Sequence, residues 1–230
     1  MSLTKIFLLI MDEKRTKGYV ILNKSERALV RAVGLVRARE GTRSCGVLSY
    51  VRREVANGVE AFVATDGRSL AVLERRSELP SFTQLYTPGG QRVAPWREEK
   101  LGAFPKWREV MPVFNSWDEP KRVDMPRVLR FTERMQRTRE NVWKLESGGL
   151  FFLKEKGKVF YFNPRRIRMA AEQLVRLGEL GFADVCSAYV STGGGLMLTA
   201  EADGMVWKYV MMPCYPSETI RYLGGNVNLV

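Results

Sequence analysis

Two stretches of the chain carry the same order of predicted elements, an amphipathic helix followed by three short strands. The first stretch spans residues 24–75 and the second spans residues 163–212. Turn pairs such as Asn57-Gly58 and Asp203-Gly204 separate runs rich in β-branched and aromatic residues. Antiparallel strands need a second layer to bury their apolar face, and a helix supplies it. We therefore predict an α+β fold, with helices packed on antiparallel sheets and internal repetition.

The predicted strands are short and are separated by turn signals. They are expected over residues 46–53, 59–65, 69–75, 149–153, 158–162, 183–190, 196–202 and 206–212. Residues 77–102 contain Pro80, Pro88, Gly89, Gly90 and Pro95, so we expect this segment to be irregular. It is interpreted as a linker or as the shortened half of a domain.

Three amphipathic helices are predicted, each with an apolar stripe on one side and arginines on the other. They are expected over residues 24–39, within residues 121–139, and over residues 163–176. Asn23 or Ser25 suits the start of the first helix, and Asn163 suits the start of the third. The basic side chains expected on the outer sides are Lys24, Arg27, Arg31, Arg130, Arg134, Arg137, Arg165, Arg168 and Arg176.

The net charge of +12 is concentrated in these helices. Residues 24–39 hold five basic and one acidic side chain, residues 121–139 seven and two, and residues 163–176 four and one. These segments contain the whole excess, so the remainder of the chain is neutral. A basic surface kept for solubility would spread the charge more evenly, which favours a polyanionic partner, nucleic acid. Arginine suits contact with phosphates, independent of base sequence.

The sequence argues against an enzyme. It contains no histidine, which removes the commonest general base and zinc ligand. Asp66, Asp118, Glu119 and Asp124 are the acids that a two-metal nuclease would use, but their spacing matches no known motif. The glycines at 193–195 lack the Lys-Ser/Thr of a phosphate loop. We expect no catalytic residues, no metal and no cofactor.

The cysteine count and the apolar runs indicate the compartment. Cys45, Cys186 and Cys214 are odd in number and widely spaced, so neither a disulfide framework nor a zinc cluster is indicated. The apolar run at residues 6–11 is too short for a signal peptide or a membrane span. We expect a cytoplasmic protein without a membrane partner.

Four motifs, in chain order, resemble those of the bacterial DNA polymerase III β subunit, the sliding-clamp family. Residues 62–71 read Phe-Val-Ala-Thr-Asp-Gly-Arg-Ser-Leu-Ala, and residues 104–112 read Phe-Pro-Lys-Trp-Arg-Glu-Val-Met-Pro. Residues 162–163, Phe-Asn, precede a predicted helix, and residues 209–214 read Tyr-Val-Met-Met-Pro-Cys. The resemblance covers about residues 20–215. It implies antiparallel sheets outside and helices that face a central hole threaded by double-stranded DNA.

The resemblance also implies a hydrophobic cleft that binds a short linear segment of a DNA polymerase or of another replication or repair protein. Apolar and adaptable side chains suit such a cleft. The positions carried over from the motifs are Thr65, Gly67, Arg68, Ser69, Leu70, Pro105, Glu109, Val110, Val210, Met211, Met212 and Pro213. An apolar floor is expected from Leu70, Val110, Val210, Met211 and Met212.

The chain departs from the family in both sequence and extent. Arg68-Ser69 stands where the family has His-Arg, Glu109 replaces an arginine, and Cys214 replaces a methionine. The family has three copies of its domain, whereas about two are expected here. An abbreviated domain is predicted over residues 1–102, including the irregular 77–102 segment, and a second over 103–230. Its tail, residues 215–230, could cover or occupy the cleft.

Two functions remain open at this point. The first is a sliding-clamp-like processivity or tethering factor that embraces duplex DNA and docks an enzyme on it. A homo-oligomeric ring is one possible assembly of such a factor. The second is a non-ring adaptor or regulator, derived from a clamp, that binds a protein partner. The shortened first domain and the tail favour the second function, and the clustered charge favours the first.

Overall fold

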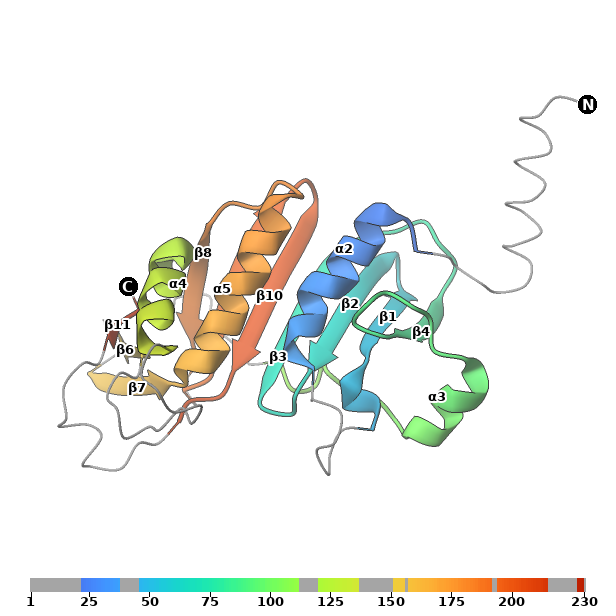
Figure 1. Ribbon diagram of the computed structural model, residues 1–230, viewed down its shortest axis with the longest axis horizontal. Helices are drawn as coiled ribbons and strands as arrows, with labels where there is room; N and C mark the ends of the chain where they lie inside the picture. The colour runs from blue at the N-terminus through green and yellow to red at the C-terminus, as the bar shows by residue number, and fades with distance from the viewer. Residues whose placement is uncertain are drawn as a thin grey trace, which may run out of the picture.

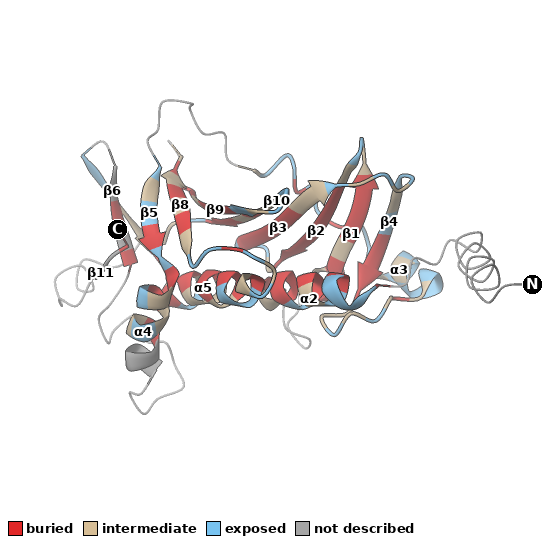
Figure 2. Ribbon diagram, turned by 90° about the horizontal axis from the view of Figure 1, so that it is seen from above, coloured by how far each residue is buried: buried red, intermediate tan, exposed pale blue. Residues whose placement is uncertain are grey.

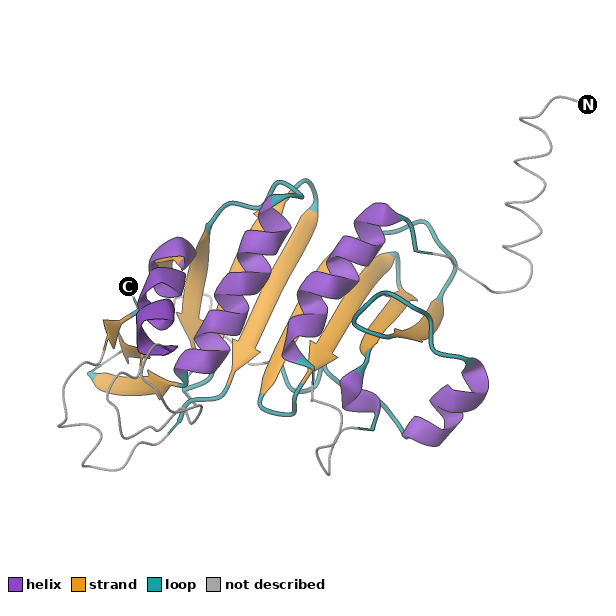
Figure 3. Ribbon diagram, in the orientation of Figure 1, coloured by secondary structure: helices purple, strands orange, loops and turns teal. Residues whose placement is uncertain are grey.

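In the computed structural model, the described residues are 22–37, 46–111, 120–136, 151–155, 157–191, 194–214 and 227–229. The helices are α2 (Lys24–Val33), α3 (Pro95–Leu101), α4 (Met125–Gln136) and α5 (Pro164–Gly178), with 3-10 turns η1 (Gly34–Val36) and η2 (Val47–Ser49). The strands are β1 (Val51–Ala56), β2 (Val59–Thr65), β3 (Ser69–Arg76), β4 (Phe82–Tyr86), β5 (Lys121–Asp124), β6 (Phe151–Glu155), β7 (Lys158–Phe162), β8 (Val185–Val190), β9 (Leu196–Ala202), β10 (Met205–Met211) and β11 (Val227–Asn228). Figure 3 shows where these helices and strands lie in the molecule.

One antiparallel sheet of eight strands joins the two repeats. Its order is β4-β1-β2-β3-β10-β9-β8-β5, and the two repeats meet where β3 pairs with β10. A smaller sheet has the order β11-β6-β7, in which β11 runs parallel to β6. The α+β class and the helix-on-sheet arrangement are confirmed. The division of the chain at residue 102 stays a prediction, and the large sheet runs across it.

Helices α5 and α2 lie side by side on one face of the large sheet, and α4 stands next to α5 and projects away from the sheet (Figures 1 and 2). Between these layers lies the main core, which contains Leu29, Phe62, Leu73, Leu174 and Trp207. Strand residues alternate between the two faces, so the neighbours of these core residues point outward. No helix in the described part of the chain is long and apolar enough to span a membrane.

A second apolar cluster lies on the outer face of the sheet, opposite the helices. It contains Val63, Leu70, Val72 and Val210 from the strands. Phe104 and Trp107, from the segment that follows α3, belong to the same cluster and cover it. Strand β2 is therefore buried on both faces, which explains its nearly continuous apolar sequence.

The helix starts follow the predicted caps. The Asn23 side chain accepts a hydrogen bond from the Glu26 N–H (2.8 Å), and the Asn23 N–H donates to the Glu26 carboxylate (2.9 Å), a complete capping box. The Asn163 side chain accepts from the Arg165 N–H at the start of α5 (3.0 Å). These local contacts explain why the sequence pattern located both helices.

Two expectations about the backbone are corrected. The 77–102 segment is not irregular throughout, because it contains β4, which pairs with β1, and α3. The prolines and glycines bound these elements rather than disrupt them: Gly90, with φ of +87°, lies in the turn after β4, and Pro95 opens α3. Residues 47–49 form a 3-10 turn instead of strand, and the sequence pattern missed β5.

Candidate nucleic-acid face and peptide site

The outer side of α2 is basic because its one acid is turned inward. Lys24, Arg27 and Arg31 are exposed, while the opposite side of the helix packs in the core. The Glu26 carboxylate is buried and pairs with Arg53 (2.7 Å) and Arg75 (3.0 Å) of the sheet. Glu26 therefore does not neutralise the exposed cations of its own helix.

The other two helices of the row extend this basic face. Arg165 and Arg176 on α5 and Arg130 on α4 are exposed, as predicted, and so is Arg127, which the sequence analysis did not single out. Its spacing of three residues from Arg130 was the available signal. We call the exposed residues Lys24, Arg27, Arg31, Arg127, Arg130, Arg165 and Arg176 the basic helix face.

Three residues predicted to contact DNA are not counted in this face. Arg168 is only partly exposed, because its guanidinium pairs with Glu172 one turn further along α5 (2.5 Å). The side chain of Arg134 and the whole of Arg137 lie outside the described part of the chain. The acids considered for a nuclease have local roles: Asp124 accepts a hydrogen bond from the Arg127 N–H (2.9 Å), and Asp66 organises a turn. Asp118 and Glu119 are not described.

The β3–β10 pairing brings together the first and last of the resembling motifs. Leu70 lies opposite Val210, and Ser69 lies opposite Met211. The Met212 N–H donates to the Arg68 carbonyl (3.3 Å), so the chain beyond β10 stays against the turn that precedes β3. About 140 residues of sequence separate these motifs, and the sheet places them side by side.

The turn between β2 and β3 is held by its own side chains. The Thr65 hydroxyl donates to the Ser69 carbonyl (2.7 Å) and accepts from the Gly67 N–H (3.0 Å). The Asp66 carboxylate accepts from the N–H groups of Arg68 (2.9 Å) and Ser69 (2.7 Å). Gly67 has φ of +81°, a conformation that favours glycine. The turn therefore offers a rigid rim to the site.

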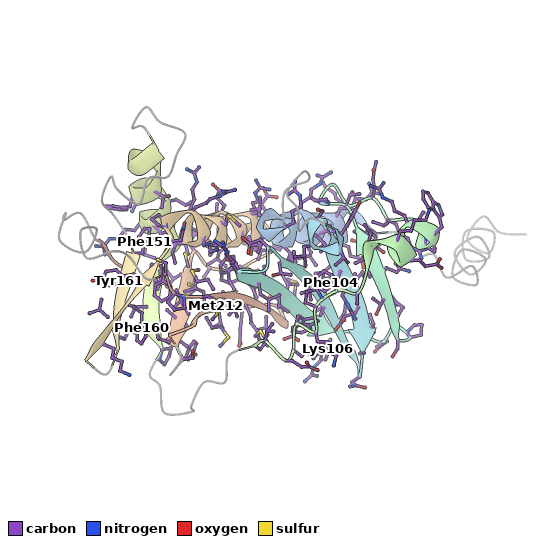
Figure 4. All side chains as sticks on the ribbon, turned by 90° about the horizontal axis from the view of Figure 1, so that it is seen from below. Phe104, Lys106, Phe151, Phe160, Tyr161 and Met212 are labelled. Atoms are coloured by element: carbon purple, nitrogen blue, oxygen red, sulfur yellow. The ribbon has the colours of Figure 1, made fainter. Side chains whose placement is uncertain are left out.

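The second motif covers the outer face beside this turn. The Trp107 indole N–H donates to the buried Glu54 carboxylate (3.2 Å), and Arg108 pairs with the same carboxylate. Phe104 is buried, whereas Pro105, Glu109 and Val110 are exposed. The sequence analysis missed the anchoring roles of Phe104 and Trp107. Figure 4 shows Phe104 and Lys106 on this segment, with Met212 beyond the end of β10.

The predicted floor residues are divided: Leu70 and Val210 share one cluster, whereas Val110 is exposed outside it and Met211 lies on the other face. Leu70 and Val210 belong to the outer cluster, Met111 and Met197 pack against it, and Met212 is 61% exposed. Met211 instead lies in the helix-side core, because successive residues of a strand point to opposite faces. Ser69 is also buried. We call Leu70, Met111, Met197, Val210 and Met212 the seam site.

The described end of the tail belongs to the small sheet and not to the seam site. Val227 and Asn228 pair with β6, and Leu229 is buried in the main core. Figure 1 shows β11 and the C-terminus beyond α4, at the opposite end of the sheet from β4. Residues 215–226 lie outside the described part. The backbone N–H of Cys214 donates a hydrogen bond to the Tyr161 carbonyl of β7 (2.8 Å). Burial raises the pKa of the Cys214 thiol.

No group of three or more His, Cys, Asp or Glu side chains is placed to hold a metal ion among the residues that the structure describes. Asp66, in the turn before β3, pairs with Arg166 of α5 (3.3 Å). Its carboxylate is therefore committed to the turn and to the helix layer.

This sheet, with helices in a row on one face, is the fold of the DNA sliding clamps. Among solved structures, the Streptococcus pneumoniae DNA polymerase III β chain matches with a TM-score of 0.60 and 12% identity, over 85% of this chain and 64% of its own. The Thermotoga maritima β subunit (0.56, 10%, 86% and 65%) and the Bacillus subtilis sliding clamp (0.55, 12%, 83% and 62%) match similarly. This chain thus spans slightly less than two thirds of their length.

The likeness is one of fold, because the identities are low. No protein-family model matches the sequence, and no curated protein matches it. The fold that the four motifs implied is confirmed by the solved structures. Membership of the family, DNA binding and peptide docking stay predictions.

Proposed function

We propose that this protein is a clamp-like tether that lies against duplex DNA with its basic helix face. The observation that carries the proposal is the separation of charge in the helix layer. Exposed cations come from three adjacent helices, while Glu26 is buried against Arg53 and Arg75, and Glu172 is paired with Arg168. A duplex laid across this row of helices would meet cations from each of them.

The expected contact is with the phosphate backbone. Guanidinium groups donate paired hydrogen bonds to phosphate oxygens, and each contact releases condensed counterions. Binding should therefore depend steeply on salt and little on base sequence, as suits a tether that moves along DNA. The protein itself would carry out no chemistry.

The seam site is proposed to dock a partner, such as a DNA polymerase or another replication or repair protein. Exposed Met212 offers an adaptable side chain next to the strands whose Leu70 and Val210 lie buried in the outer cluster. A short linear segment with apolar side chains would fit this surface. The site lies on the outer face and the basic face on the other, so DNA and partner would bind together.

Encircling DNA would require more than one copy, since this chain is shorter than the clamps with which it shares its fold. Light scattering at low and moderate salt measures the mass in solution. A discrete oligomer large enough to close a ring supports an encircling clamp. A monomer at all concentrations favours the adaptor, in which the fold serves to present the seam site.

The DNA proposal is tested by reversing charges on α2. The double variant Arg27→Glu/Arg31→Glu should bind a fluorescein-labelled duplex at least tenfold more weakly, and the slope of log K against log salt should fall by about two. Fluorescence anisotropy across a salt series, with duplexes of unrelated sequence, measures both quantities.

The matched control places the same charge change elsewhere. Arg76→Glu/Lys106→Glu alters two exposed cations outside the helix row, on β3 and on the segment after α3. It should retain most of the duplex affinity. Equal losses in both double variants would show that only net charge matters, and a loss confined to one DNA sequence would contradict backbone contact.

A further inference from the structure

Helix α3 displays a tryptophan that does not anchor it. Trp96 is 64% exposed, and none of the side chains of α3 is buried. The helix is held instead by contacts from its other residues: the Glu98 carboxylate accepts from the Leu85 N–H of β4 (3.0 Å), and the Arg97 guanidinium lies over the Tyr50 ring (5.9 Å). The exposed part of the Trp96 indole that Lys100 does not cover is thus available to a ligand.

No other exposed large apolar side chain lies on α3, and the charged side chains of this helix are Arg97, Glu98, Glu99 and Lys100. The Lys100 ammonium lies over the Trp96 ring, 5.6 Å from its centre, and Arg97 is exposed next to it. The other large apolar side chains exposed in the described part are Val110, Val159, Val175 and Met212, none of them on α3. A protein-docking patch needs a contiguous apolar centre. One aromatic ring with neighbouring cations is instead typical of sites where bases stack.

The position of α3 connects it to the basic helix face. Figure 1 shows α3 at the end of the molecule that carries β1 and β4. The turn that leads from β4 toward α3 packs on the basic helix face, where a Cβ on Gly90 would lie 3.2 Å from the Arg27 side chain. A DNA strand that leaves the duplex at this end would pass α3.

We propose that α3 binds single-stranded DNA, with Trp96 stacked on a base and with Arg97 and Lys100 against the adjoining phosphates. This inference rests on the proposed duplex contact, which it extends to a junction between duplex and single strand. A tether that holds an enzyme at such a junction would gain orientation from a second, strand-specific contact.

The test compares three labelled DNAs: a blunt duplex, the same duplex with a single-stranded thymidine tail, and oligothymidylate. The tail should raise the affinity of the unmodified protein, and Trp96→Ala should remove about a tenfold gain, the value of one stacked base. Trp96→Phe keeps an aromatic face and should retain most of the gain. Because Trp96 is exposed, circular dichroism should show an intact fold in both variants.

The outcomes separate this site from the duplex face. A blunt duplex bound equally by the unmodified protein and Trp96→Ala, with the gain from the tail lost in the variant, supports the proposal. A single-stranded DNA tail that does not raise the affinity overturns the proposal and leaves the proposed duplex contact intact. Oligothymidylate bound through Trp96 without any duplex binding supports the α3 site and overturns the duplex face. Binding to none of the DNAs, or a Trp96 effect only on a protein partner, overturns the proposal.

Discussion

Arg53 is a fully buried charge at the centre of four paired side chains. Its guanidinium contacts Glu60 (2.5 Å) and Glu26 (2.7 Å), and Arg75 pairs with the same two carboxylates. Burial by itself would lower the pKa of Arg53, but the two carboxylates outweigh it and raise the pKa, so the residue stays charged. The cluster ties α2 to β1, β2 and β3, and it turns Glu26 away from the basic helix face.

Removing Arg53 should destabilise the protein severely. Arg53→Met leaves two buried carboxylates with one cation, and we expect the free energy of unfolding to fall by about 3–5 kcal/mol. Urea denaturation followed by circular dichroism measures it. Glu109→Gln serves as the control, because its pair with Lys106 is largely exposed and should contribute less than about 1 kcal/mol. Similar losses in the two variants would contradict the role assigned to the buried cluster.

At the scale of elements, successive side chains of a strand point to opposite faces of the sheet, and this divides the motif at 209–214 between two layers. Val210 faces the outer cluster, and Met211 faces the helix-side core. Met212 follows the end of β10 and is exposed. The motif at 209–214 therefore contributes to stability with one methionine and to a surface with the other. A reading of the motif as one cleft does not make this distinction.

This division predicts opposite effects for the two methionines. Met212→Asp should abolish capture of short apolar peptides selected by phage display on the unmodified protein, with thermal stability unchanged. Met211→Ala should lower the free energy of unfolding by about 2–5 kcal/mol because it leaves a cavity in the core. Peptide capture that survives Met212→Asp would move the docking surface elsewhere.

At the scale of the whole molecule, a buried glutamine joins the two repeats. The Trp207 indole N–H of β10 donates to the Gln173 side-chain carbonyl of α5 (3.0 Å), and the Gln173 amide donates to the Val33 carbonyl at the end of α2 (3.3 Å). Gln173 and Trp207 are fully buried. Together with the β3–β10 pairing, this chain of hydrogen bonds makes one core of both helix-and-strand repeats.

Breaking this link should weaken the whole molecule at once. Gln173→Leu leaves the buried Trp207 N–H without a partner, at a cost of about 1–3 kcal/mol, and removes the link to the Val33 carbonyl. Calorimetry should show a lower Tm and a single transition, since the sheet remains continuous. Gln91→Leu, at an exposed position, is the control and should change little. Two separate transitions in unmodified protein would contradict a shared core.

The helix starts and the turn at residues 66–67 could be predicted from the sequence, because the interactions that form them join residues close together in the chain. Asn23 and Asn163 cap helices through residues two or three positions away, and the turn at residues 66–67 depends on its own side chains. The 3.6-residue periodicity identified which side of each helix is buried, and hence that Arg27 and Arg31 are exposed. The prolines and glycines of 77–102 misled the prediction, because the same residues that break an element also bound one.

Sequence periodicity, caps and charge thus determined the α+β class, the three core-covering helices and their basic outer sides. Only the tertiary structure decided that β3 pairs with β10, that Glu26 turns inward to Arg53, and that Val227 joins β6. Each of these contacts joins residues far apart in the chain, and no local preference encodes which distant strand or charge will be the partner. The burial of apolar surface shared by the whole sheet selects them.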